Sequence, residues 1–229
     1  GEGIPKMLQQ LLFLTPMNDI DRLESVLKAH HDSIAAMLIE PIMGNCCGIS
    51  ATPEFVKAAR ELCTRYGVLL IVDEVKTGFR VAKGGAQQLY GITPDISTFA
   101  KAMGNGYPIS AIGGREEVMR KYGRGVAHGG TYTAHSVSIA AAEKTLEILD
   151  ETPALATLAA YGERLKAGMK QVLDARGIVH SFSGHSSMFG LFFAPEPPRD
   201  YRAWKRSDYR FYDAMAQPLH DLGVICEPD

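Results

Sequence analysis

The chain has 229 residues, of which 46% are hydrophobic and 22% charged, and its formal net charge is −2 at pH 7. This balance is typical of a globular protein, and the scattered Lys and Arg residues disfavour both a nucleic-acid groove and an anionic membrane surface. No apolar run approaches the roughly 18 residues of a membrane span, and the first ten residues lack the apolar core of a signal peptide. We therefore expect a cytoplasmic protein whose partner is a small molecule.

The first part of the chain predicts a helix followed by a strand. Asn18 or Asp19 can cap a helix whose apolar positions recur at helical spacing and which ends near His31. The segment SIAAMLIE then has the composition of a strand and finishes at Glu40.

The next elements continue this alternation. Thr52-Pro53 predicts the start of a second helix, which Gly67 ends, and the apolar run VLLIV is then typical of a buried strand. Shorter candidates follow, namely the strands DISTFA and ISAIGG and the small helix REEVMRKY. Alternating helices and strands indicate a mostly parallel sheet with helices on both faces, an α/β fold.

The second part of the chain has a different pattern, which begins at Ser136. It predicts two long helices, SVSIAAAEKTLEILD and ALATLAAYGERLKAGMKQVLDAR, the strand-like pieces IVHSFS and SMFGLFF, and a last helix from Tyr209 to Leu222. Pro218 should kink or shorten that last helix. We expect one large unit over residues 1–150 and a smaller α+β unit over residues 151–229.

The four cysteines indicate neither a disulfide framework nor a metal centre. Cys46, Cys47, Cys63 and Cys226 show no CxxC spacing, and the two adjacent cysteines are poorly placed to chelate one ion. Reduced thiols in the cytosol fit the pattern better. We expect no metal site.

Two acidic residues, Asp73 and Glu74, directly follow the strand VLLIV. Ligands of open α/β sheets bind outside the carboxyl ends of the strands, so Asp73 is placed to meet a ligand. Taken alone, Asp73 would more often cap a turn or pair with Arg80. Glu74 is expected to make a structural hydrogen bond or salt bridge.

Lys101 follows the next strand candidate, in STFAKAMGNGYP. Burial among the apolar residues on either side would favour its neutral, nucleophilic amine, and the glycines after it would let the backbone approach a flat ligand. Lys76 is a rival amine that we interpret as solvent-facing or structural. A lysine imine with a carboxylate partner is the chemistry of pyridoxal 5′-phosphate (PLP), in which Asp73 would keep the ring nitrogen protonated.

A phosphate group would find donors in HGGTYTAHS. The amides of Gly129 and Gly130 and the hydroxyl of Thr131 precede a helix that is expected to begin near residue 135, and such turns bind phosphate. Thr131 could instead be an ordinary turn residue. His128 and His135 flank the turn, and a structural role is at least as favourable for them.

The segments EPIMGN, LLIVDEVKTGFR, TPDISTFAKAMGNGYP and GGTYTAHS, in this order, resemble the class III PLP-dependent aminotransferases. The similarity extends over essentially the whole chain and is greatest to the glutamate-1-semialdehyde 2,1-aminomutase-like branch. It implies PLP-dependent transferase fold type I, a mostly parallel sheet flanked by helices with a smaller C-terminal α+β domain. Residues 1–150 would be the later part of the large PLP-binding domain, and residues 151–229 part of the small domain.

The resemblance also implies catalytic roles for single residues. Lys101 matches the family's imine-forming lysine, which also moves a proton between the substrate and the cofactor. Asp73 matches the partner of the ring nitrogen. Val75 matches the apolar side chain that packs on one face of the ring.

Further positions would bind the cofactor or the substrate. Thr131, next to Gly130, matches a threonine that reaches the phosphate of the neighbouring subunit, which implies a homodimer. Glu40 and Asn45 match polar positions near the phenolic oxygen of the cofactor and the substrate. The family's Ser-Gly-Thr phosphate loop and its second ring-stacking aromatic residue precede the region seen here, so we expect the chain to be a portion of a longer protein.

These features predict an enzyme that moves an amino group on PLP through a Lys101 Schiff base. It would be either a glutamate-1-semialdehyde 2,1-aminomutase-like enzyme or a class III aminotransferase acting between separate molecules. Racemisation or decarboxylation on the same cofactor stays open. The alternative from another class is a non-catalytic or truncated relative that acts in dimerisation or regulation.

Overall fold

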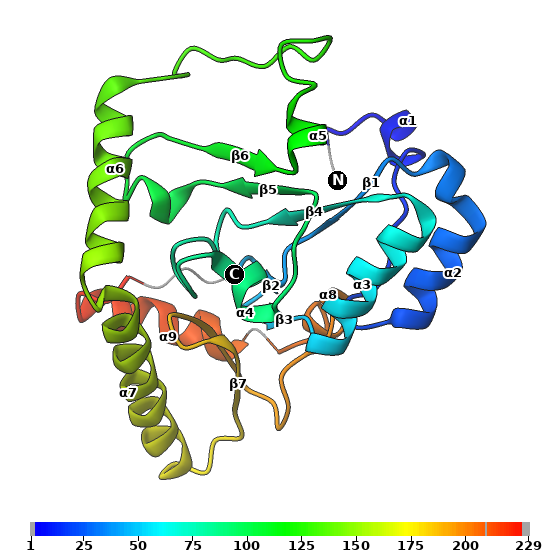
Figure 1. The fold of residues 1–229 in the computed structure, drawn as a ribbon. Helices are drawn as coiled ribbons and strands as arrows, with labels where there is room; N and C mark the ends of the chain where they lie inside the picture. The colour runs from blue at the N-terminus through cyan, green and yellow to red at the C-terminus, as the bar shows by residue number, and fades with distance from the viewer. Residues whose placement is uncertain (1–2, 209, 226–229) are drawn as a thin grey trace.

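A four-stranded sheet lies at the centre of the computed structural model, which describes residues 3–208 and 210–225 (Figure 1). The strand order is β1-β4-β5-β6, with bounds Ala36–Ile39, Leu69–Asp73, Ile96–Phe99 and Ala111–Gly114. β1, β4 and β5 are parallel, and β6 pairs antiparallel with β5. The mostly parallel sheet expected from the sequence is therefore confirmed.

Two helices, α2 (Ile20–His30) and α3 (Pro53–Tyr66), pack against β1 and β4. The N-termini of both helices are capped by residues that the sequence predicts. The Asp19 carboxylate accepts a hydrogen bond from Arg22 N at 2.9 Å, and the Thr52 hydroxyl accepts one from Phe55 N at 3.1 Å. The core that they bury contains Leu23, Leu27, Ile39, Phe55, Val56, Ala59, Leu62, Cys63, Val68, Leu70 and Val72.

Asp95 connects β4 with β5. Its side chain is 2% exposed and accepts hydrogen bonds from Leu70 N at 2.7 Å, Arg60 Nη1 at 2.8 Å and Arg115 Nη1 at 2.9 Å. Burial alone raises the pKa of this carboxyl, but the three donors outweigh it and hold the pKa below the ordinary value of 3.8. The charged network thus fixes the two parallel strands side by side.

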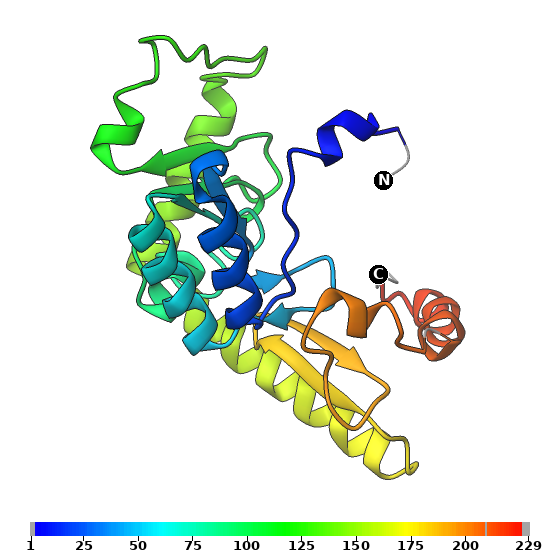
Figure 2. The same ribbon diagram turned by 90° about the vertical axis from the view of Figure 1, so that its right-hand side faces the viewer.

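The second part of the chain contains the long helices α6 (Ser136–Glu151) and α7 (Ala154–Asp174), the antiparallel pair β7 (Ser181–His185) and β8 (Met188–Phe192), α8 (Tyr201–Trp204) and α9 (Arg210–Asp221). Figures 1 and 2 show α7, β7 and α9 below the sheet. Pro218 lies inside α9, which continues to Asp221, and Tyr209 and Cys226 fall outside the described residues. The division at residue 151 stays a prediction.

Several short elements were not expected from the sequence. They are α1 (Lys6–Gln9), η1 (His31–Ser33), β2 (Ile42–Met43), β3 (Ile49–Ser50), α4 (Gly85–Tyr90), η2 (Lys101–Met103) and α8, while α5 (Glu116–Met119) is only four residues long. Within residues 3–208 and 210–225, no helix has the length and apolar character needed to cross a lipid bilayer.

Candidate active site

The carboxyl ends of the three parallel strands carry candidate residues of the site. Glu40 follows β1, Asp73 ends β4, and Lys101 follows β5 after a single alanine. Because the three strands are neighbours and run in the same direction, these ends meet at one edge of the sheet. We refer to Glu40, Asn45, Asp73, Lys76 and Lys101 as the strand-end cluster.

Asp73 is half-buried and keeps one carboxylate oxygen available. Its Oδ1 accepts a hydrogen bond from Val75 N at 2.8 Å, whereas no hydrogen bond to Oδ2 is formed by the residues that the structure describes. Asp73 lines a cavity of about 430 Å³ together with Glu40 and with segments 14–17 and 200–202. An ionised carboxylate in this position can hold a protonated nitrogen of a ligand.

Glu40 lies within electrostatic range of the other charged members of the cluster. Burial is the main factor that raises the pKa of its carboxyl, and the negative charge of Asp73 raises it further. A hydrogen bond from Gly44 N to Oε2, at 3.3 Å, and the positive charges of Lys76 and Lys101 act in the opposite direction. The charges at the three strand ends are therefore coupled.

Lys76 belongs to the same cluster through Asn45. Asn45 lies on the turn between β2 and β3, and its Oδ1 accepts a hydrogen bond from Lys76 Nζ. The Lys76 stem passes directly over Gly44, where an added Cβ would overlap it. The structure thus supports the structural interpretation of the half-buried Lys76 over the solvent-facing one.

Lys101 is exposed in the structure, so the burial expected from its apolar neighbours is not found. The residue has φ of 44° and starts the short η2 turn. That turn places Met103 in the interior, at 6% exposure, and leaves the Lys101 side chain at the surface of the described chain. Its amine is accessible to a carbonyl compound.

Glu74 holds the segment after Asp73 in place. Its fully buried carboxylate accepts hydrogen bonds from Ala86 N at 2.8 Å, from Gln87 N at 2.7 Å and from the Thr77 hydroxyl. The two amides belong to the N-terminus of α4, where a negative charge is favourable. Glu74 is thus structural, as the sequence indicates.

The phosphate candidates are separate from the strand-end cluster. Gly130 and Thr131 are exposed on the segment between α5 and α6, which extends above the sheet in Figures 1 and 2. No hydrogen bond or ion pair between described residues joins them to Asp73 or Lys101. Within one chain, the structure therefore does not bring these two parts of the expected site together.

Val75 and the histidines near the phosphate candidates have clear local environments. Val75 is half-buried beside Asp73, to which its amide donates. His135 caps α6, where its Nδ1 accepts from Ser138 N at 3.4 Å. The His128 ring packs edge-on against Tyr122, with ring centroids 5.3 Å apart. These contacts favour the structural interpretation of both histidines.

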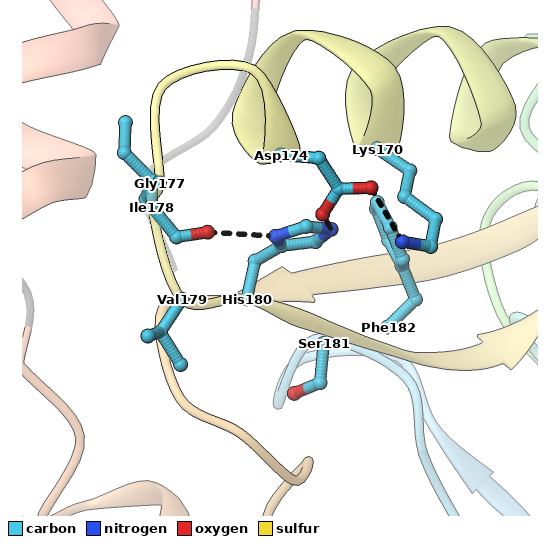
Figure 3. Close-up of a pocket in the computed structure, with 8 residues that line it drawn as sticks. All are labelled: Lys170, Asp174, Gly177, Ile178, Val179, His180, Ser181 and Phe182. Atoms are coloured by element: carbon cyan, nitrogen blue, oxygen red, sulfur yellow. Dashed lines mark hydrogen bonds and ion pairs between the residues drawn. The ribbon is translucent and has the colours of Figure 1, made fainter.

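A second cavity, of about 440 Å³, lies where α7 is followed by β7 (Figure 3). Lys170 Nζ donates to the Asp174 carboxylate at 2.6 Å, and this hydrogen bond holds the pKa of Asp174 below its ordinary value. His180 Nδ1 lies 2.9 Å from the carbonyl oxygen of Ile178, and Nε2 lies 3.9 Å from Asp174 Oδ1. Ser181 points away from this pair in Figure 3. The charged groups of this cavity neutralise one another, and we assign it no chemistry.

Comparisons with known proteins identify the family of the chain. A family model described as aminotransferase class-III matches residues 5–228. The chain is similar to a glutamate-1-semialdehyde 2,1-aminomutase of Polynucleobacter asymbioticus, with 40% identity over 99% of the chain and 52% of the relative. It is similar to one of Neisseria meningitidis with 37% identity over 99% of the chain and 53% of the relative.

A comparison with solved structures also finds similarity to a transaminase. The crystal structure of an omega-transaminase from Sphaerobacter thermophilus matches with a TM-score of 0.92 and 33% identity, over 100% of this chain and 53% of the other. The chain thus spans about half the length of the curated relatives it matches.

Proposed function

This chain belongs to the class-III aminotransferase family, and on that premise we propose that it is part of a PLP-dependent enzyme that transfers amino groups. It adopts the PLP-dependent transferase fold type I of that family. The observation that carries the proposal is the meeting of Glu40, Asp73 and Lys101 at the carboxyl ends of three neighbouring parallel strands. No observation favours the non-catalytic alternative.

The residues present fit PLP chemically. Asp73 offers a carboxylate oxygen that could hold the ring nitrogen in its protonated form, and Lys101 offers an exposed amine. Val75 would pack on one face of the ring, and Glu40 and Asn45 would lie near the phenolic oxygen. When bound, PLP supplies an electron sink for the negative charge that develops at a substrate carbon.

The chain's own residues would then manage protons and charge. The Lys101 amine takes the proton from the substrate carbon that bears the nitrogen, as a general base. The Asp73 carboxylate would stabilise a positive charge on the ring nitrogen. Glu74 keeps Asp73 and Val75 in position through its contacts with α4.

We also propose a homodimer in which Gly130 and Thr131 bind the phosphate of the neighbouring subunit. Their exposure, and their separation from Asp73 and Lys101 within one chain, support this arrangement. A Thr131→Ala variant should bind PLP more weakly while the dimer persists in sedimentation experiments. An unchanged PLP affinity would remove Thr131 from the site.

The Schiff-base assignment can be tested by borohydride reduction of the PLP-loaded protein, followed by peptide mass mapping. We expect one phosphopyridoxyl group on Lys101, and its loss together with turnover in Lys101→Ala. Lys76→Ala is the matched control and should keep the adduct. An adduct on Lys76, or turnover that survives in Lys101→Ala, would contradict the assignment.

The relatives' names suggest two kinds of amino-group transfer. In the aminomutase, the amine returns to the adjacent carbon of the same molecule, whereas in an ordinary aminotransferase it goes to a separate carbonyl acceptor. Incubation with glutamate-1-semialdehyde alone distinguishes them. We expect 5-aminolevulinate without an added keto acid if the aminomutase assignment holds.

A further inference from the structure

Lys76 contributes a positive charge to the strand-end cluster and acts electrostatically on the Glu40 carboxylate. Among the residues that the structure describes, its Nζ donates to the neutral amide oxygen of Asn45 and forms no ion pair. An ammonium group carries three N–H donors, so two of them stay available for a ligand.

The position of this ammonium is set by the turn between β2 and β3. Gly44 has no side chain at the point where the Lys76 stem crosses it, and its amide donates to Glu40 at 3.3 Å. Asn45 then receives the end of the Lys76 side chain. The Lys76 stem therefore lies over the turn, and its charge acts on the nearby Glu40 carboxylate.

The positive charge of Lys76 can compensate for the two carboxylates of the cluster. Glu40 and Asp73 would repel an anionic substrate that enters beside them. An amine acts as a nucleophile or base only in its neutral form. In that role Lys101 carries no positive charge that could offset the repulsion. Within the cluster, Lys76 is then the cation that can attract a negatively charged group. Arg202, which lines the cavity of Glu40 and Asp73, is a further cation of this region.

We propose that Lys76 determines specificity by binding a carboxylate of the substrate. The enzyme would then prefer amino acids to amines of the same length that lack a negative charge. This inference rests on the proposed function, since it names the substrate class of the same site.

The test uses the PLP-loaded protein at its natural length and two amine donors, 4-aminobutanoate and 1-aminobutane. The rate of the first half-reaction is measured in single turnovers, so that no carboxylated acceptor is present. In Lys76→Met, the ratio of kcat/KM for the two donors should fall about tenfold to a hundredfold, the range for a hydrogen bond to a charged group. Lys57→Met, which removes an exposed lysine of α3, should leave the ratio unchanged.

A second variant separates charge from hydrogen bonding. Lys76→Gln can still donate to Asn45 but has no charge, and it should lose the preference to the same degree as Lys76→Met. Calorimetry with butanoate gives a readout independent of turnover, and its dissociation constant should rise in both variants. An unchanged ratio in Lys76→Met, or a preserved ratio in Lys76→Gln, would overturn the inference while an adduct on Lys101 keeps the proposed function. Absence of that adduct in the unmodified protein would overturn both.

Discussion

Replacing Glu74 by glutamine tests whether the buried carboxylate holds the segment of the candidate active site that contains Asp73 and Val75. The substitution keeps the size of the side chain and exchanges one carboxylate oxygen for an NH2 group. Both oxygens of Glu74 face backbone N–H groups, since Oε2 accepts from Ala86 N and Oε1 from Gln87 N. In either orientation of the glutamine, a donor must therefore face a donor.

The cost follows from these contacts. One amide of α4 loses its acceptor in a fully buried position, which costs about 1–3 kcal/mol, and the remaining hydrogen bonds lose their charged acceptor. We expect Glu74→Gln to lower the free energy of unfolding by about 3 kcal/mol. With a shift of about 2–4 °C per kcal/mol for a chain of this size, the melting temperature should fall by about 10 °C.

The assay is equilibrium unfolding in urea, with Glu143→Gln as the matched control. Glu143 is exposed on α6, so its replacement should change stability by less than about 0.5 kcal/mol. A loss below about 1 kcal/mol in Glu74→Gln would show that the hydrogen bonds of Glu74 do not stabilise this segment as the structure implies.

Three further outcomes follow from the structure. Because the pKa of Asp95 is held below its ordinary value of 3.8, its ion pairs stabilise the folded chain at pH values above that value. The free energy of unfolding should therefore exceed that of Asp95→Asn by about 2 kcal/mol near neutral pH. This difference should disappear as the pH falls below about 4. A constant difference in urea unfolding between about pH 6 and pH 3 would contradict this assignment. Gly162→Ala should lower the melting temperature, because the new Cβ would overlap the Ser186 carbonyl, while Gly168→Ala on the same helix meets open space and should not. Burial raises the pKa of Cys63 to about 11, so iodoacetamide at about pH 8 should leave it unmodified until the protein unfolds, and labelling of the native protein would refute its burial.

The elements that the sequence predicted best are those whose signals are local. α3 begins at Thr52 and ends before Gly67 because a hydroxyl cap and a left-handed glycine act within one turn of the helix. α4 also ends at a left-handed glycine, Gly91, but it has no side-chain cap at its N-terminus. It is a six-residue helix whose first residue is the second of two glycines, and its N-terminal amides are satisfied by Glu74, which directly follows β4. A glycine-rich segment of this kind has the composition of a loop.

For α5 the prediction was wrong in length, because the helix is shorter than the segment that the sequence pattern indicates. REEVMRKY has good helix formers, but none of the residues in α5 is buried, so no packing holds the last turn. Helices this short are marginal without a buried face. The sequence pattern gave a correct position for the element and an incorrect length.

The two lysines show where sequence reasoning about the site reaches its limit. Lys101 has apolar neighbours in the sequence and was predicted to be buried, whereas Lys76 lacks such neighbours and was not. In the structure, Lys101 is exposed and Lys76 is half-buried. The cause is geometric, because residues at strand ends do not share the environment of their sequence neighbours. η2 turns Met103 inward in place of Lys101, whereas Lys76 is covered by the turn at Gly44 and Asn45, which is far away in the sequence. The mostly parallel sheet could be expected from the alternation of elements, but the contacts of Lys76 with Gly44 and Asn45 exist only in the folded chain.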